Sequence, residues 1–123
     1  AWRRSDKRCT MIEQVSPRDL TSWLQAAGGA GRPLLLDVRE PREWQLVSVQ
    51  SDAAELLQMA MHTVPPRLHE LDPQRPVAVL CHHGGRSMQV AMFLARHGFA
   101  RVANVAGGID AWALQLDPTL PRY

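Results

Sequence analysis

One short segment of the chain combines a thiol, two imidazoles, two glycines and a permanent cation, in the order Cys81-His82-His83-Gly84-Gly85-Arg86. It follows the apolar run 77–80 and precedes a helical pattern, so we expect it to join a buried strand to a helix. Unpaired N–H groups and a partial positive charge at a helix N-terminus favour a thiolate over a thiol. The two glycines let the loop curl until its N–H groups converge on one point. We therefore expect Cys81 to be a nucleophilic sulfur held by its own loop.

Position alone leaves a second interpretation of Cys81 open. A cysteine at the end of a buried strand often serves only as a small apolar side chain. The neighbouring residues favour the reactive interpretation, because a structural cysteine needs neither loop glycines nor a nearby cation. In that interpretation Arg86 orients an anionic substrate.

Four further polar residues were weighed as parts of the same site. We expect His82 and His83 to lie exposed in the loop and to help attract anions. Adjacent histidines point in different directions and the sequence offers no evident third ligand, so no metal is expected. Asp37, at the end of a second apolar run, is interpreted as a hydrogen-bonded support for neighbouring loops. Arg39 has three interpretations, at the rim of the pocket, as a support for it, or in a surface salt bridge.

The elements that must position these residues follow from the apolar pattern. We expect strands at 11–15, 34–38, 77–80 and 101–105, and helices at 17–27, 41–44, 87–97 and 109–114. Residues 45–64 are the least legible: Val47 and Val49 alternate as in a strand, and 56–61 is interpreted as another strand. Pro65 and Pro66 are expected to open a short helix. Buried strands that alternate with helices predict an α/β domain with a mainly parallel central sheet and helices on both faces.

Length, charge and cysteine content bound the class of protein. A chain of 123 residues predicts one domain, which we assign to residues 11–123. Residues 1–10 carry a net charge of +3, which leaves −1 for the rest of the chain. We expect those ten residues to be a flexible basic extension and find no basic surface for nucleic acid. No apolar run is long enough for a membrane span, and no signal sequence is evident.

The two cysteines are too few for a disulfide scaffold, so we expect a reducing, cytoplasmic compartment. Cys9, in the basic extension, is interpreted as a bystander. Thirteen arginines against one lysine suggest a bacterial genome rich in G and C.

Three segments together resemble one known family, the single-domain rhodaneses, which are sulfurtransferases of the thiosulfate type. Residues 81–87 resemble the C-x-x-G-x-R-[ST] loop of that family. Residues 34–41 resemble its L-[LI]-D-V-R-E strand, and residues 104–112 resemble its closing N-[VL]-x-G-G-[IM]-x-[AE]-W segment. The three motifs occur in the family's order, and the resemblance covers about residues 12–114.

The resemblance implies a thiosulfate:cyanide type of sulfurtransferase with Cys81 as its catalytic residue. Cys81 would accept a sulfane sulfur from thiosulfate or a related donor, become a persulfide and pass the sulfur to a thiophilic acceptor. No metal or other cofactor is implied. The implied substrate contacts come from the loop, from His82, His83, Gly84, Gly85, Arg86 and Ser87.

Other functions were weighed against this one. Cysteine phosphatases use C-x5-R, whereas Cys81 to Arg86 is C-x4-R, and Leu80 stands where tyrosine phosphatases have histidine. A persulfide relay with a protein donor stays open, because residues 48–62 depart from the family's usual G-H-I-P-G-A segment. A non-catalytic rhodanese-fold module that binds a partner protein is less favoured, because this chain keeps both the cysteine and the loop cation.

Overall fold

A parallel sheet of five strands forms the centre of the computed structural model, which describes residues 11–27 and 32–123. The strands are β1 (Ile12–Val15), β2 (Leu34–Asp37), β3 (Glu55–Gln58), β4 (Val77–Leu80) and β5 (Val102–Val105). Their order, β1-β5-β4-β2-β3, places β4 in the middle. The carboxyl ends of all strands therefore meet at one edge, where open α/β sheets bind ligands. The predictions for residues 1–10, Cys9 included, lie outside the described residues.

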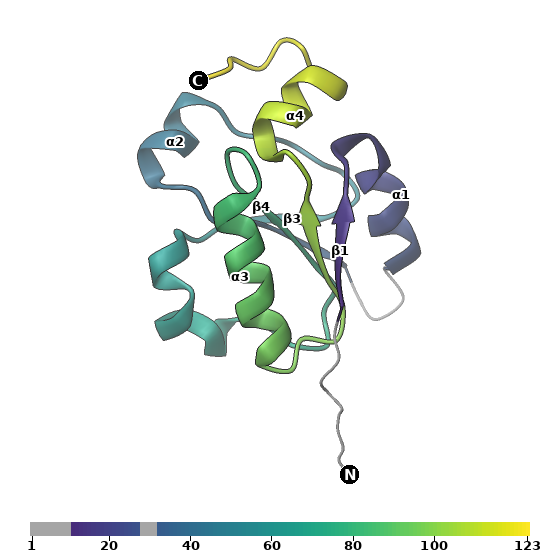
Figure 1. The fold of residues 1–123 in the computed structure, drawn as a ribbon, viewed down its shortest axis with the longest axis vertical. Helices are drawn as coiled ribbons and strands as arrows, with labels where there is room; N and C mark the ends of the chain where they lie inside the picture. The colour runs from purple at the N-terminus through teal and green to yellow at the C-terminus, as the bar shows by residue number, and fades with distance from the viewer. Residues whose placement is uncertain (1–10, 28–31) are drawn as a thin grey trace.

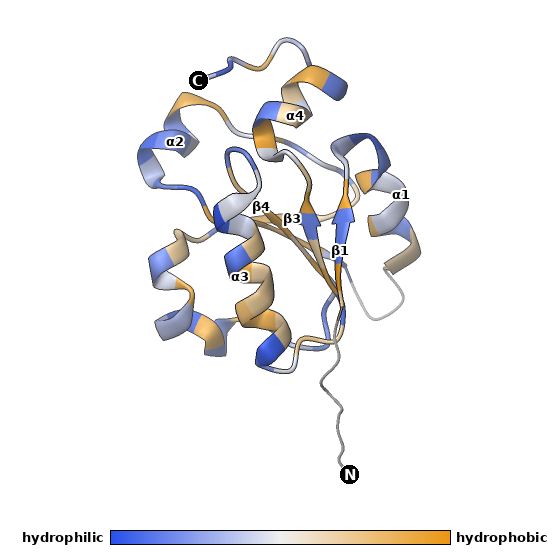
Figure 2. Ribbon diagram, viewed as in Figure 1, coloured by the Kyte–Doolittle hydropathy of each residue, from blue (hydrophilic) through white to orange (hydrophobic). Residues whose placement is uncertain are grey.

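Helices cover both faces of this sheet, as the sequence predicts (Figure 1). On one face lie α1 (Pro17–Ala27) and α4 (Gly108–Gln115), and on the other lies α3 (Gly85–Arg96). In β4, Ala78 and Leu80 face the first layer and Val77 and Val79 face the second. The central strand β4 is accordingly apolar along its whole length (Figure 2), as expected of a parallel strand buried on both faces. The other two inner strands each contain one buried polar residue, Asp37 in β2 and Asn104 in β5. The α/β fold class is confirmed.

Most predicted boundaries hold to within two residues. The strand expected at 11–15 begins at Ile12, and α2 (Pro41–Leu46) runs two residues beyond the expected end. The helix expected from Ser87 begins at Gly85, so Arg86 and Ser87 lie in its first turn. No helix within residues 11–27 and 32–123 has both the length and the apolar character needed to cross a bilayer.

The segment 45–64 differs most from its prediction. Val47 and Val49 are buried, at 6% and 1% exposure, but they lie in no strand. Their alternation reflects packing against the core shared with α1 and α4, because β3 takes the edge position beside β2 only from Glu55. The strand expected at 56–61 is therefore β3, shifted towards the N-terminus. The chain then forms the 3-10 helices η3 (Met61–Thr63) and η4 (Pro65–Glu70), and the second is the short helix expected at Pro65.

Candidate active site

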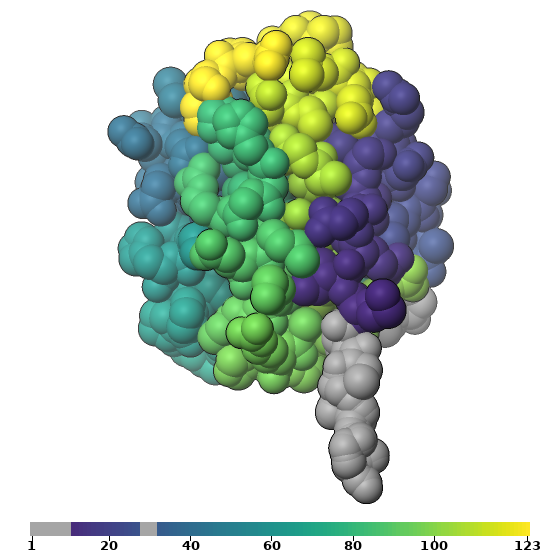
Figure 3. All heavy atoms as spheres, in the orientation of Figure 1, coloured from purple at the N-terminus to yellow at the C-terminus, as the bar shows by residue number. Residues whose placement is uncertain are grey.

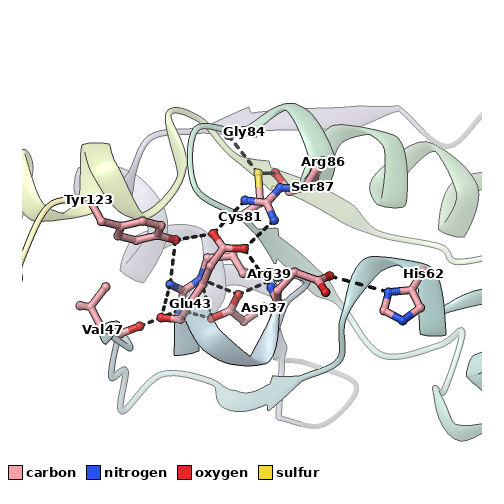
Figure 4. A network of polar contacts seen from close by, with 11 residues as sticks. Asp37, Arg39, Glu43, Val47, His62, Cys81, Gly84, Arg86, Ser87 and Tyr123 are labelled. Carbon is pink, nitrogen blue, oxygen red and sulfur yellow. Dashed lines mark hydrogen bonds and ion pairs between the residues drawn. The ribbon is translucent and has the colours of Figure 1, made fainter. Parts of the chain in front are cut away.

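Cys81 follows β4 directly and lies at the centre of the carboxyl edge of the sheet. It is 1% exposed, and its Sγ accepts a hydrogen bond from the Gly84 N–H at 3.1 Å. The thiol in turn donates to the Ser87 hydroxyl at 3.2 Å. Figure 4 shows the sulfur between the loop backbone and the first turn of α3. The predicted meeting of thiol, loop N–H and helix start is therefore present in the structure.

The two loop glycines have different structural roles. Gly84 has a φ of +107°, in the left-handed region, which lets its N–H turn back towards the sulfur. Gly85 begins α3, is not among the positive-φ glycines, and has no atom within 4 Å of where a Cβ would lie. The expectation that both glycines curl the loop is therefore correct for Gly84 and wrong for Gly85.

The first turn of α4 holds the loop from behind. The Ile109 N–H donates to the Cys81 carbonyl at 2.9 Å, and the Asp110 N–H donates to the His82 carbonyl at 3.1 Å. Gly108 has no room for a side chain, because a Cβ there would collide with the same two carbonyls. The two bonds satisfy the loop carbonyls from the α4 side. The close approach that they require explains the glycine of the closing motif at position 108.

A chain of hydrogen bonds leads from the sulfur to the first strand of the sheet. The Ser87 hydroxyl donates to Asn104 Oδ1 at 2.5 Å, and Asn104 Nδ2 donates to Gln14 Oε1 at 3.0 Å and to the Gly84 carbonyl at 3.3 Å. Asn104 is 4% exposed. In the sequence, Asn104 stands out only as the first residue of the closing motif. Its burial beside the thiol loop, where a polar side chain needs a partner, marks it as a site residue in the structure.

Arg86 does not project freely from the loop. Its guanidinium donates to both carboxylate oxygens of Glu43, at 2.7 and 3.0 Å, in a bidentate pair. These bonds lower the pKa of Glu43 to about 2, and Glu43 in turn raises the pKa of Arg86. The sequence indicates Arg86 as the loop cation but gives no sign of Glu43, which lies 43 residues away in α2.

Tyr123 reaches the same carboxylate from the end of the described chain. Its hydroxyl donates to Glu43 Oε2 at 2.6 Å and accepts from Arg39 at 3.0 Å (Figure 4). Its ring stacks on His82 with 3.9 Å between centroids and 10° between planes. Burial, the largest cause, raises the pKa of the Tyr123 phenol to about 12. The C-terminal segment thus packs against the loop (Figure 3), although its sequence gives no helical or strand pattern.

Asp37 and Arg39 form a buried ion pair beneath the site. Both side chains are 0% exposed, and Arg39 donates to Asp37 Oδ2 at 2.7 Å. Arg39 also donates to the backbone carbonyls of Glu43 and Val47 at 3.2 and 2.9 Å. The supporting role expected of Asp37 agrees with this geometry. For Arg39, the pocket rim and the surface salt bridge are wrong, because the side chain is fully buried. The third expectation, a support for the site, agrees with its bonds to Asp37 and to the turn.

The two loop histidines have a third neighbour that the sequence did not reveal. Potential ligand atoms of His82, His83 and Asp110 lie within 4.8 Å of one another. His83 is largely exposed, but the His82 ring lies between those of His83 and Tyr123, and burial is the main cause that lowers its pKa. The expectation that both histidines are exposed is therefore wrong for His82. Asp110 is paired with Arg122 at 2.8 Å, so a metal would have to displace that arginine.

Comparisons with known proteins agree with the fold. The rhodanese-like domain family matches residues 20–115. A sulfurtransferase from Allochromatium vinosum is 40% identical over 99 residues, which cover 80% of this chain and 89% of that protein. The rhodanese-like/PpiC domain-containing protein 12 of Arabidopsis thaliana, a chloroplast protein, is 36% identical over 112 residues, or 91% of this chain. This chain spans only 38% of that relative's length.

A solved structure of a polysulfide-sulfur transferase from Wolinella succinogenes is also similar. It has a TM-score of 0.66 and 28% identity, and the match covers 91% of this chain and 78% of that one. The fold is therefore shared over most of both chains. The chain belongs to the rhodanese-like domain family, and the resemblance that its sequence motifs indicated is confirmed.

Proposed function

We propose that this protein is a sulfurtransferase that carries a sulfane sulfur on Cys81 as a persulfide. The observation that carries the proposal is the setting of the sulfur, which is buried at the centre of the sheet edge and accepts the Gly84 N–H. The relatives named as sulfurtransferases support the same class of reaction. Donors within the proposal are thiosulfate and related compounds, the acceptor is a thiophile, and the compartment is a reducing one such as the cytoplasm.

The proposed transfer takes two balanced steps. The Cys81 thiolate attacks the outer sulfur of thiosulfate, the sulfur–sulfur bond of the donor breaks, and sulfite leaves with the electron pair. Cyanide or a thiolate then attacks the outer sulfur of the persulfide, and the Cys81 thiolate is released. The reaction uses no metal or other cofactor, and the protein gains and loses no electrons over the cycle.

The loop residues have separate parts in this cycle. The Gly84 N–H, 3.1 Å from Sγ, stabilises negative charge on the sulfur. The Ser87 hydroxyl accepts a hydrogen bond from the Cys81 thiol and is itself oriented by the bond that it donates to Asn104. We assign His82 and Gly85 to the pocket through their backbone, and the exposed His83 to contact with the bulk of a donor or acceptor.

Steady-state kinetics with thiosulfate and cyanide test the proposal. Because sulfite leaves before the acceptor binds, double-reciprocal plots at several cyanide concentrations should be parallel. Intersecting lines would mean that both substrates bind together, and would contradict a persulfide intermediate. A variant at an exposed α4 position, Leu114→Ala, serves as the control for handling and purity, because its side chain is 63% exposed.

A further inference from the structure

Among the residues that the structure describes, three arginines contact the Cys81 loop or the side chains around it, and each is already paired with a carboxylate. The pairs are Arg86–Glu43 at 2.7 Å, Arg39–Asp37 at 2.7 Å and Arg122–Asp110 at 2.8 Å. Only Arg86 belongs to the loop itself, and Cys81 is among the groups that interact electrostatically with it. The charge available to attract an anion to the sulfur therefore depends on the Arg86–Glu43 pair.

Glu43 is held firmly in that pair. Oε1 accepts from Arg86 and from the Glu40 N–H at 3.0 Å, and Oε2 accepts from Arg86 and from Tyr123 at 2.6 Å. Its side chain is only 8% exposed, so water screens the pair little from the Glu43 side. These four donors fill the hydrogen-bond acceptor sites of the carboxylate, so none is left for another cation. The pair is thus a closed unit of zero net charge beside the pocket.

A paired cation attracts a distant anion far less than a free one does, because the fields of the two partners cancel beyond a few ångströms. Thiosulfate is a dianion and depends on such attraction. A persulfide, R–S–SH, offers the same outer sulfur with at most one negative charge. The Arg86–Glu43 pair therefore penalises the first donor more than the second.

We propose that Glu43, braced by Tyr123, determines donor specificity: it withdraws the Arg86 cation from the pocket, so that the site takes its sulfur from a persulfide in preference to thiosulfate. This inference rests on the proposed function. The step is balanced: the Cys81 thiolate attacks the outer sulfur of R–S–SH, the donor's sulfur–sulfur bond breaks, and R–S⁻ leaves with the electron pair. The product is Cys81–S–SH, and its proton is the one that the donor carried.

The wild-type protein gives the first test, without any substitution. Cysteine persulfide or thiosulfate is added as the probe, and sulfur loading of Cys81 is followed by the intact mass of samples quenched at timed intervals. The rates are measured from about 50 to 500 mM salt. The inference predicts faster loading from cysteine persulfide and a thiosulfate rate that changes less than about twofold with salt. A thiosulfate rate that falls steeply with salt would show a free cation at the pocket and overturn it.

The substitution Glu43→Gln gives the second test, because glutamine keeps acceptor and donor groups but removes the countercharge. The ratio of the thiosulfate rate to the persulfide rate should rise about fivefold at low salt, and salt should abolish the gain. A ratio is used because a freed Arg86 also acts on the thiol, and that effect is common to both donors. Tyr123→Phe, which keeps the ring on His82 but loses the hydroxyl, should raise the ratio by a smaller factor.

Pro121→Ala is the matched control in the same segment, since Pro121 is exposed and its side chain has no hydrogen-bonding group to lose. An unchanged ratio in Glu43→Gln, with both rates reduced alike, would mean that Glu43 only maintains the loop's shape and would overturn the inference. The proposed function fails in a different way, by the absence of sulfur on Cys81 with either donor. The two failures are therefore distinguishable.

Discussion

The loops after β2 and β4 are neighbours, since the Val38 N–H donates to the Leu80 carbonyl at 2.9 Å, yet their polar groups have opposite fates. After β2, Asp37 and Arg39 bind each other with both side chains fully buried. After β4, the Cys81 sulfur has one backbone donor and one hydroxyl acceptor. The side chains of the first loop bind each other, the local backbone and Tyr123, whereas the second loop holds the sulfur that we propose as the nucleophile.

The two arginine–carboxylate pairs make the same contrast. Both have a closest contact of 2.7 Å, but Arg86 is 35% exposed and Arg39 is 0% exposed. Burial of an ion pair costs desolvation energy, so the inner pair acts as a strut and is sensitive to the loss of either partner. The outer pair is partly exposed beside the Cys81 loop, and in our proposal its net charge influences which donor approaches. Identical chemistry therefore supports the fold in one place and, in our proposal, selects substrate in the other.

The largest expected effect is on the reactive side of this comparison. Cys81→Ser should lower sulfur transfer by about a thousandfold or more, because the hydroxyl is not a comparable nucleophile at neutral pH. The thermal midpoint should change little, since the side chain stays small and keeps its contact with Ser87. Substantial transfer by the variant, measured in the thiosulfate and cyanide assay, would contradict the assignment of Cys81.

The next largest effect is expected on stability, when the buried Asp37–Arg39 pair is broken. Arg39→Met leaves the buried Asp37 carboxylate without its cationic partner and should cost about 3–5 kcal/mol of unfolding free energy, measured by urea unfolding. The double variant Asp37→Leu with Arg39→Met removes both charges and should recover part of that loss. A single variant within about 1 kcal/mol of wild type would show that the pair is no strut.

The smallest expected effect is the pH dependence of stability that the Arg86–Glu43 pair causes. Arg86 holds the pKa of Glu43 at about 2, below its ordinary 4.5, so the folded state releases that proton more readily than the unfolded state. The pair's contribution to stability is therefore complete above pH 4.5 and is lost as the pH falls towards 2. Urea unfolding between these pH values should show a steeper loss for wild type than for Glu43→Gln. Equal slopes for the two proteins would contradict the pairing.

Local sequence signals account well for the strands and the loop. The runs at 34–38, 77–80 and 101–105 predict buried parallel strands, because such strands are apolar on both faces. The glycines and the cation after Cys81 indicate its loop for the same local reason. Residue type alone does not separate Gly84 from Gly85, whose backbone conformations differ. The C-x-x-G-x-R-[ST] motif does separate them, because it requires glycine only at position 84.

The missed residues share a different feature, which is distance along the chain. Tyr123 contacts Glu43 across 80 residues, and Asn104 contacts Gln14 across 90. No periodicity or motif encodes such pairings, because they depend on how the sheet brings its carboxyl edge together. The alternation at Val47 and Val49 misled for a related reason: it reports burial, and burial does not require a strand partner.

The most direct test of the persulfide is the intact mass of the reduced protein before and after exposure to a sulfane-sulfur donor, and again after cyanide. Thiosulfate and cysteine persulfide are tried in parallel, with Cys81→Ser as the control. The account predicts the gain of one sulfur atom on Cys81, its removal by cyanide as thiocyanate, and no gain in the variant. A folded wild-type protein that gains no sulfur from either donor would contradict the central claim.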